Sequence, residues 1–152
     1  MPMPERLKLK SLDEVSARLD ALERHPAPAN EGTWSVAQVL IHCAQSIEYS
    51  LAGYPKAKGA LFQKTVGRIA LRKFLGAGAM SHDLAAAIPD APEPPASTTL
   101  AEGISRLRRA ISAFRSHPGA FAPHFAYGPV TREQYEQLHA MHVANHLEKI
   151  RA

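Results

Sequence analysis

Apolar residues recur with helical spacing in four separate stretches of the chain. Within each stretch they lie three and four residues apart, which places them on one face of a helix. Each stretch opens with Ser or Thr followed three residues later by Glu or Gln, the capping box that satisfies the first backbone donors of a helix. The four boxes are Ser11 with Glu14, Ser35 with Gln38, Thr99 with Glu102, and Thr131 with Gln134. The pattern predicts helices over residues 11–23, 35–51, 99–116 and 131 to the chain end.

The longest connection lies between the second and third predicted helices. Residues 60–75 again show helical spacing and predict an additional helix, whereas residues 76–97 are rich in Pro and Ala and predict a loop. This loop fits either a mobile lid or a crossover that spans the bundle, and we prefer the crossover. Because no stretch alternates as strands do, the predicted class is all-α: a four-helix bundle with a long helical crossover between helices two and three.

Length and composition agree with one domain over residues 1–152. The chain has 152 residues, of which 45% are hydrophobic, enough to close a single core. Cys43 is the only cysteine, which excludes an intramolecular disulfide and suits a reducing compartment. No segment has the apolar length of a signal peptide or a membrane span, so we expect a cytoplasmic protein without a membrane partner.

Positive charge is concentrated in one part of the chain, although the formal net charge is only +4. Between Glu48 and Asp83 there is no acidic residue, while this stretch contains Lys56, Lys58, Lys64, Arg68, Arg72 and Lys73. Such a stretch can meet a phosphate-bearing ligand, an anionic membrane or a nucleic acid. Three of these bases repeat every four residues, as on the solvated face of a helix, and aromatic residues are not interleaved for base stacking. We favour the solvated face and expect no nucleic-acid partner.

The last predicted helix carries three histidines on its apolar face. Projected at about 100° per residue, His139, His142 and His146 fall within an arc of roughly 60°. Imidazoles in an apolar stripe need a hydrogen-bond partner or a metal ion. His142 and His146 are four residues apart, which lets their ring nitrogens converge on one ion. His139 lies about 10 Å along the axis from His146, so we assign it to the substrate side of the pocket or to support of the ligands.

A third metal ligand should come from a neighbouring helix, and His42 in the second helix is the leading candidate. Alternative chemistries fit less well. Zinc proteases need a glutamate where Val143 follows His142, and a di-iron bundle needs a second Glu-x-x-His pair besides that of Glu136 and His139. Cys43 lies within an apolar stripe and is interpreted as a core residue rather than a nucleophile.

Three short segments together resemble the DinB-like superfamily, and in particular its branch known as domain of unknown function 1569. They are Trp34-Ser35-Val36 leading to His42, the segment from His124 to Thr131, and the closing His142-x-x-x-His146-Leu147. The resemblance implies a four-helix bundle, often dimeric, in which one histidine of helix two and two of helix four hold a divalent ion such as zinc or nickel. By position, the ligands it implies are His42, His142 and His146.

The same resemblance implies thiol-dependent transferases and metal-dependent hydrolases as possible activities. We therefore expect a metal-dependent enzyme with a small-molecule substrate, in which His139 or His124 moves a proton or orients the substrate. The alternative is a non-catalytic dimeric bundle whose metal is structural or absent. The chain departs from many relatives at Asn145, where they have a histidine, and at Glu148 and Lys149, near which they have a glutamine. These departures leave the three implied ligands in place.

Overall fold

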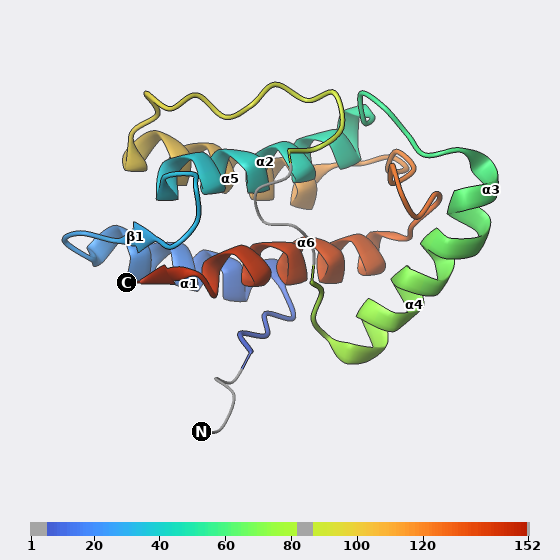
Figure 1. Cartoon of the computed structure of the whole chain (residues 1–152), viewed down its shortest axis with the longest axis horizontal. Coiled ribbons are helices and arrows are strands. Elements are labelled where there is room, and N and C mark those ends of the chain that lie inside the picture. Colours follow the sequence, from blue (N-terminus) through green and yellow to red (C-terminus); the bar gives the residue numbers. More distant parts are fainter. Residues whose placement is uncertain (1–5, 82–86, 152) are drawn as a thin grey trace.

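The structure is a computed structural model that describes residues 6–81 and 87–151, and it is mostly helical. Its longest helices are α1 (Leu12–Arg24), α2 (Val36–Ala52), α5 (Leu100–Ser116) and α6 (Arg132–Leu147). Figure 1 shows α2 beside α5 in one layer and α6 with α1 in the other, and the two layers contact each other mainly through α2 with α6 and α1 with α5. The predicted all-α class is confirmed. No helix in the described ranges has the length and apolar character needed to cross a bilayer.

The predicted helix starts are confirmed by their capping contacts. The side chain of the N-cap residue accepts a hydrogen bond from the third helical residue in α1, α2, α5 and α6. In the last three helices the Glu or Gln side chain also accepts from the N-cap backbone, which completes the box. In α1 the Glu14 carboxylate instead accepts from the backbone N–H of Lys10. Local sequence therefore fixes where these helices begin.

The core forms where the apolar faces of these helices meet. Large side chains that are almost completely buried come from every one of the four longest helices: Leu12, Leu19, Leu40, Ile47, Leu107, Phe114 and Tyr135. Gly103 lets α5 approach α2 closely, because a Cβ at this position would lie 3.0 Å from the carbonyl oxygen of Ala37. The tight contact between α2 and α5 thus depends on a missing side chain as well as on apolar burial.

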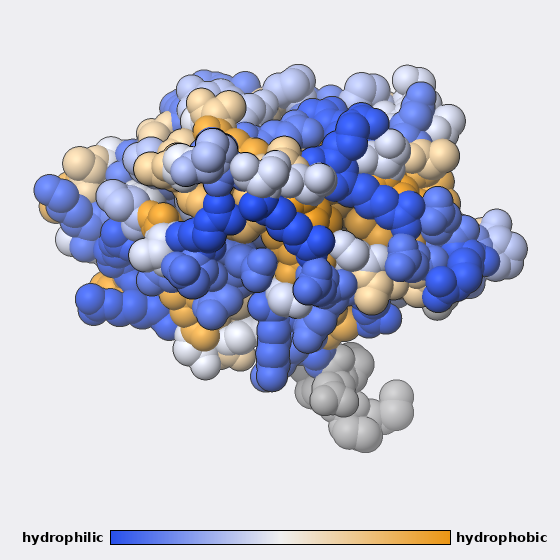
Figure 2. All heavy atoms as spheres, turned by 180° about the vertical axis from the view of Figure 1, so that it is seen from behind, coloured by the Kyte–Doolittle hydropathy of each residue, from blue (hydrophilic) through white to orange (hydrophobic). Residues whose placement is uncertain are grey.

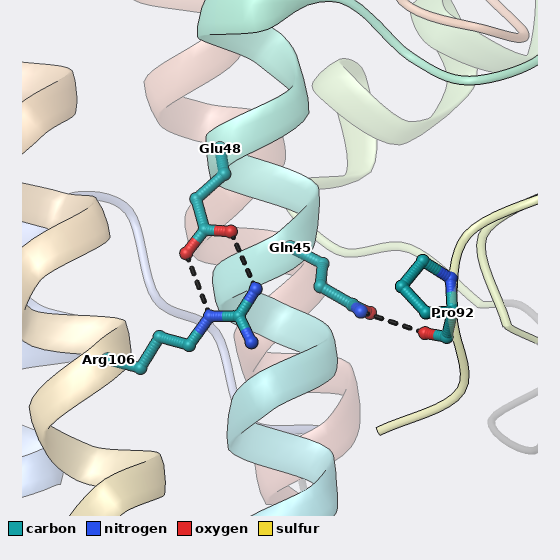
Figure 3. Close-up of polar contacts among 4 residues, drawn as sticks. All are labelled: Gln45, Glu48, Pro92 and Arg106. Atoms are coloured by element: carbon teal, nitrogen blue, oxygen red, sulfur yellow. Dashed lines mark hydrogen bonds and ion pairs between the residues drawn. The ribbon is translucent and has the colours of Figure 1, made fainter. Parts of the chain in front are cut away.

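Polar contacts fix α5 and the crossover against α2 (Figure 3). Arg106 of α5 forms a bidentate ion pair with Glu48 of α2, with N–O distances of 3.0 and 2.9 Å. On another side of α2, the Gln45 amide donates to the carbonyl oxygen of Pro92 at 2.9 Å, and Gln38 donates to that of Pro94 at 2.9 Å. These bonds attach this part of the predicted loop to α2, which favours the crossover over the lid there; residues 82–86 lie outside the described residues.

The additional helix predicted in the connection is present but irregular. It comprises α3 (Ala60–Phe62), a π-helical segment η1 (Gln63–Gly67) and α4 (Arg68–Ala77). It lies at the right edge of Figure 1, outside the two layers. Its inner side rests on the segment before α6, where the Gln63 amide donates to the Phe125 carbonyl at 3.2 Å and Arg68 donates to that of Pro129 at 2.6 Å.

The end of the chain differs from the sequence-based prediction in two ways. The last helix ends at Leu147 instead of running to the terminus, and a short antiparallel pair of strands is present, β1 (Ala29–Asn30) with β2 (Ile150–Arg151). The backbone N–H of Glu31 also donates to the carbonyl oxygen of Lys149 at 3.0 Å. Pairing with the α1–α2 connection gives the last residues backbone partners that a further helical turn would not reach. Two-residue strands are too short to show alternation in the sequence.

Candidate metal centre

Three imidazole rings from α2 and α6 form a nearly equilateral cluster. The centroid of the His42 ring lies 4.9 Å from that of His142 and 4.8 Å from that of His146, and the latter two are 4.9 Å apart. The ring planes meet at 67°, 68° and 84°, so the rings approach edge to face rather than stacked. One nitrogen of each ring lies within 4.8 Å of the others. The structure thus brings together the three histidines that the sequence and the resemblance proposed as ligands.

One pair of these nitrogens already has the spacing that a shared divalent ion requires. Tetrahedral zinc with Zn–N bonds of about 2.0–2.1 Å separates its nitrogen ligands by roughly 3.3 Å. The Nε2 atoms of His42 and His142 are 3.1 Å apart. Imidazole nitrogens suit zinc, nickel, copper or iron and discriminate poorly among them. The donor set is therefore compatible with a metal site and leaves the metal's identity open.

Helix geometry explains why the cluster forms at this place. His142 and His146 stand one turn apart on α6, and the contact between α2 and α6 brings His42 opposite them. The Trp34 ring packs against the His42 ring at 5.1 Å between centroids, and its Nε1–H donates to Glu93 at 3.2 Å. His42 and His146 are buried, whereas His142 is half-buried. The cluster is thus open on one side.

The open side faces a cavity of about 300 Å³. His42 and His142 line it, and His146 does not belong to its wall. The other described lining residues are mostly apolar: Phe74, Met80, Ala87, Ile88, Pro89, Phe125, Tyr127 and Leu138, with Ser46, Ser81, Lys58, His124 and His139. Lys58 is the only one of these with a permanent charge. An apolar chamber with a few converging polar groups is typical of a small-molecule site.

His139 lies on the cavity wall, apart from the three-histidine cluster. Its Nε2 is 3.0 Å from the Ser50 hydroxyl oxygen, and that hydroxyl donates its own hydrogen to the Ile47 carbonyl at 2.5 Å. The Nε2 atom must therefore carry the proton, which leaves Nδ1 as the acceptor. Burial lowers the His139 pKa to about 3, so the ring is neutral near pH 7.

His124, also on the wall, has the opposite arrangement of donor and acceptor roles. Its Nδ1 accepts backbone N–H bonds from Ala126 at 3.1 Å and Tyr127 at 3.3 Å, so Nε2 carries the proton. The ring is stacked between those of Phe125 and Tyr127, with centroid distances of 4.6 and 4.2 Å. Burial lowers the pKa of this histidine to about 3 as well. The catalytic roles assigned to His124 and His139 stay predictions, and a neutral ring suits orienting a substrate better than donating a proton.

The structure also indicates the roles of Ser50 and Cys43. Ser50 fixes the tautomer of His139, and the sequence analysis did not identify it as a site residue. Its position could have indicated this role, because Ser50 continues the apolar stripe of Cys43 and Ile47 at helical spacing and is therefore expected to face the core. Cys43 is fully buried, and burial raises the pKa of its thiol to about 12. A thiol that stays protonated in the core agrees with its interpretation as a packing residue.

Comparison with known families is decisive about kinship. The family model described as "Protein of unknown function (DUF1569)" matches residues 1–152. The chain belongs to this family. No curated protein and no solved structure matched the chain. The match confirms the DUF1569 part of the resemblance seen in the three short segments, while the link to the DinB-like superfamily stays a prediction.

Acid should destabilise the metal-free protein through its buried neutral histidines. The folded-state pKa values of His139 and His124 are both about 3, below the ordinary value of about 6.5 in an unfolded chain. Between these values the unfolded state binds more protons, so the stability present above pH 6.5 is lost as the pH falls toward 3. Each histidine contributes at most about 1.4 kcal/mol per pH unit to this loss.

Urea unfolding of the metal-free protein at pH 7, 5.5 and 4.5 measures this effect. The free energy of unfolding should fall at each step, and His139→Gln should show a smaller fall than the wild type because glutamine does not titrate in this range. An equal pH dependence in both proteins would contradict the assignment of His139 as a buried neutral ring.

Proposed function

We propose that this chain is a metal-dependent enzyme of the DinB-like type, acting on a small molecule as a hydrolase or a thiol-dependent transferase. Its metal ion, zinc or nickel, is held by His42, His142 and His146. The observation that carries the proposal is the triangle of imidazoles, with ring centroids 4.8–4.9 Å apart, two of which line a cavity of about 300 Å³. In this proposal α1, α2, α5 and α6 are the four helices of a DinB-like bundle, and the protein works as a cytoplasmic homodimer.

The proposed ligand set and its open side support this choice of reaction class. A divalent ion held by His42, His142 and His146 would lower the pKa of a bound water or thiol and so supply a nucleophile near neutral pH. His124 offers an Nε2–H donor and His139 an Nδ1 acceptor on the cavity wall, which orient the polar part of a substrate. The surrounding apolar side chains exclude water from the reacting atoms.

The cavity wall also indicates the kind of substrate. Lys58 is the one described lining residue with a permanent charge, and it comes from the acid-free stretch of the sequence. An ammonium group beside an apolar chamber favours a small substrate with an apolar body and an anionic group. Hydrolysis and thiol transfer both remain within this description, because each needs a nucleophile at the same open position.

Cobalt titration of untagged protein tests the proposal, because Co²⁺ accepts zinc-type ligands and has a visible spectrum. We expect one Co²⁺ ion per chain with a spectrum typical of four- or five-coordinate nitrogen and oxygen ligation, displaced by Zn²⁺. Addition of azide or 2-mercaptoethanol should then change the spectrum, since an enzyme of this type keeps an exchangeable position.

Two outcomes would contradict the proposal in different ways. No binding of Co²⁺, Zn²⁺ or Ni²⁺ would remove the metal site altogether. Binding of Co²⁺ with a spectrum that azide and thiol leave unchanged would indicate a closed, structural ion and favour the non-catalytic dimeric bundle. Wild-type protein denatured in urea is the control for adventitious binding to histidines.

A further inference from the structure

The outer side of the irregular helix formed by α3, η1 and α4 exposes a group of large apolar side chains. Leu61 is 78% exposed, Phe62 36%, Val66 55% and Ile69 68%. Within the described residues, these are the large hydrophobic side chains that stand open to solvent, and all four come from residues 61–69. Phe62, Val66 and Ile69 recur at intervals of four and three residues, so they share one side of the helix. We call these four residues the apolar strip.

Basic side chains lie on the same helix as the apolar strip. Lys64, Arg72 and Lys73 are exposed, and Arg68 is half-buried. No carboxylate in the described part of the chain forms an ion pair with Lys64, Arg72 or Lys73, and the sequence has no acid between Glu48 and Asp83. In Figure 2 the edge of the molecule formed by this helix, at the left of the view, shows hydrophilic and hydrophobic residues side by side. The helix that carries the apolar strip thus exposes large apolar side chains together with charges of positive sign only.

A solvated helix face explains the basic residues of this segment but not the apolar ones. The inner side of the helix already has its own contacts, because Leu71 is buried and Gly67 lies against the backbone of Ala126. The apolar strip is thus additional to the side that packs on the protein. Exposed apolar clusters of this kind, rimmed by charge, mark surfaces that bind a partner.

From this arrangement we infer that the α3–η1–α4 helix docks on the surface of an anionic lipid membrane. A helix of this type lies in the interface with its apolar side chains at the acyl boundary, while Lys and Arg extend to the lipid phosphates. Such peripheral contact differs from spanning, which the described helices do not support. It departs from the expectation of no membrane partner, which was based on the absence of a spanning segment.

Charge complementarity favours this partner over a second copy of the chain. A two-fold contact through the apolar strip would bring Lys64, Arg72 and Lys73 of one copy toward the same residues of the other, without acids between them. A nucleic acid would satisfy the charges, but it offers nothing to Leu61, Val66 and Ile69, and aliphatic side chains do not stack on bases. An anionic bilayer offers lipid phosphates to the basic side chains and acyl chains to the apolar ones.

Vesicle flotation of the full chain tests the inference, with phosphatidylcholine vesicles compared with vesicles that also contain phosphatidylglycerol. The wild type should float with the anionic vesicles only, and high salt should release it. Leu61→Ser with Ile69→Ser should weaken binding at least about tenfold while keeping every charge. Lys64→Gln, Arg72→Gln and Lys73→Gln together should weaken it roughly 100-fold, at about fivefold for each base.

A matched control variant distinguishes the effect of the charges on this helix from the effect of the protein's net charge. Arg18, Arg24 and Arg109 are exposed bases on α1 and α5, and their triple change to Gln removes the same charge. This control should float like the wild type. All substituted positions are exposed, so circular dichroism should show unchanged folding, and Co²⁺ binding should also be unchanged, which keeps this test independent of the metal site.

Three results would overturn the inference. The first is failure of the wild type to float with anionic vesicles. The second is equal loss of binding in the two triple variants, which would indicate net charge alone. The third is a dimer of the wild type that Leu61→Ser with Ile69→Ser converts to a monomer, which would assign the apolar strip to self-association.

Discussion

Alanine in place of His142 or His146 is expected to abolish the retention of zinc. Each change removes one of three proposed nitrogen ligands whose rings lie 4.8–4.9 Å apart, and two imidazoles do not hold the ion against water and buffer. Loss of a residue that only supports a ligand costs about 10- to 100-fold in affinity. Loss of a ligand should exceed that range. The dissociation constant is measured by competition with a chromophoric zinc chelator, and the same loss is expected for His42→Ala.

His139→Gln is the matched control for the ligand variants. Its position on α6 lies one turn before His142, but its Nε2 donates to Ser50 rather than pointing to the cluster. The glutamine amide can make the same donation, so the variant should fold and bind zinc within a few-fold of the wild type. Equal loss of zinc in His139→Gln and in the three ligand variants would show that our division of the histidines is wrong.

Gly67→Ala should destabilise the protein although alanine is the better helix former. A Cβ at residue 67 would lie 2.0 Å from the carbonyl oxygen of Ala126, a contact that no rotamer relieves. Overpacking costs about 1–3 kcal/mol and sometimes more. A contact of 2.0 Å with backbone belongs to the upper part of that range, above the gain of about 1 kcal/mol from helix propensity. Either the helix or the segment around Ala126 must move. Urea unfolding measures the loss of stability.

Hydrogen exchange identifies which part of the molecule responds. His124 and Gly128 exchange two backbone hydrogen bonds, at 2.8 and 3.0 Å, in the segment that Gly67 contacts. Their amide protons should lose protection in Gly67→Ala. Gly76→Ala is the control in the same helix, since no atom lies within 4 Å of its added Cβ. That variant should be neutral or more stable by about 0.5–1 kcal/mol. Similar effects of both changes would contradict the tight contact at Gly67.

Helix starts were predictable because the interactions that set them are local. Ser35, Thr99 and Thr131 each exchange hydrogen bonds with a residue three positions later, and that information is contained in a few consecutive letters. The end of α6 was not predictable in the same way. The chain leaves the helix after Leu147 and pairs with residues 29–30, which are more than a hundred positions away.

Two of the three clustered histidines could be derived in the same manner. The spacing of His142 and His146 on one helix already brings two imidazoles together, whatever the rest of the chain does. His42 is different, because nothing in its own neighbourhood shows that it faces α6. Residue spacing left it a candidate, the family resemblance selected it, and the contact between α2 and α6 places its Nε2 3.1 Å from that of His142.

By itself, the sequence determined the all-helical class, the beginnings of the four longest helices and the paired histidines of α6, since each depends on hydrogen bonds or spacing within one or two turns. Only the tertiary structure decided that His42 completes the cluster, that Gly67 must lack a side chain, and that Leu61, Val66 and Ile69 remain exposed. These features depend on which surfaces of distant segments pack together. Hydrophobic periodicity identifies the apolar face of a helix, but it does not show which other segment packs on that face.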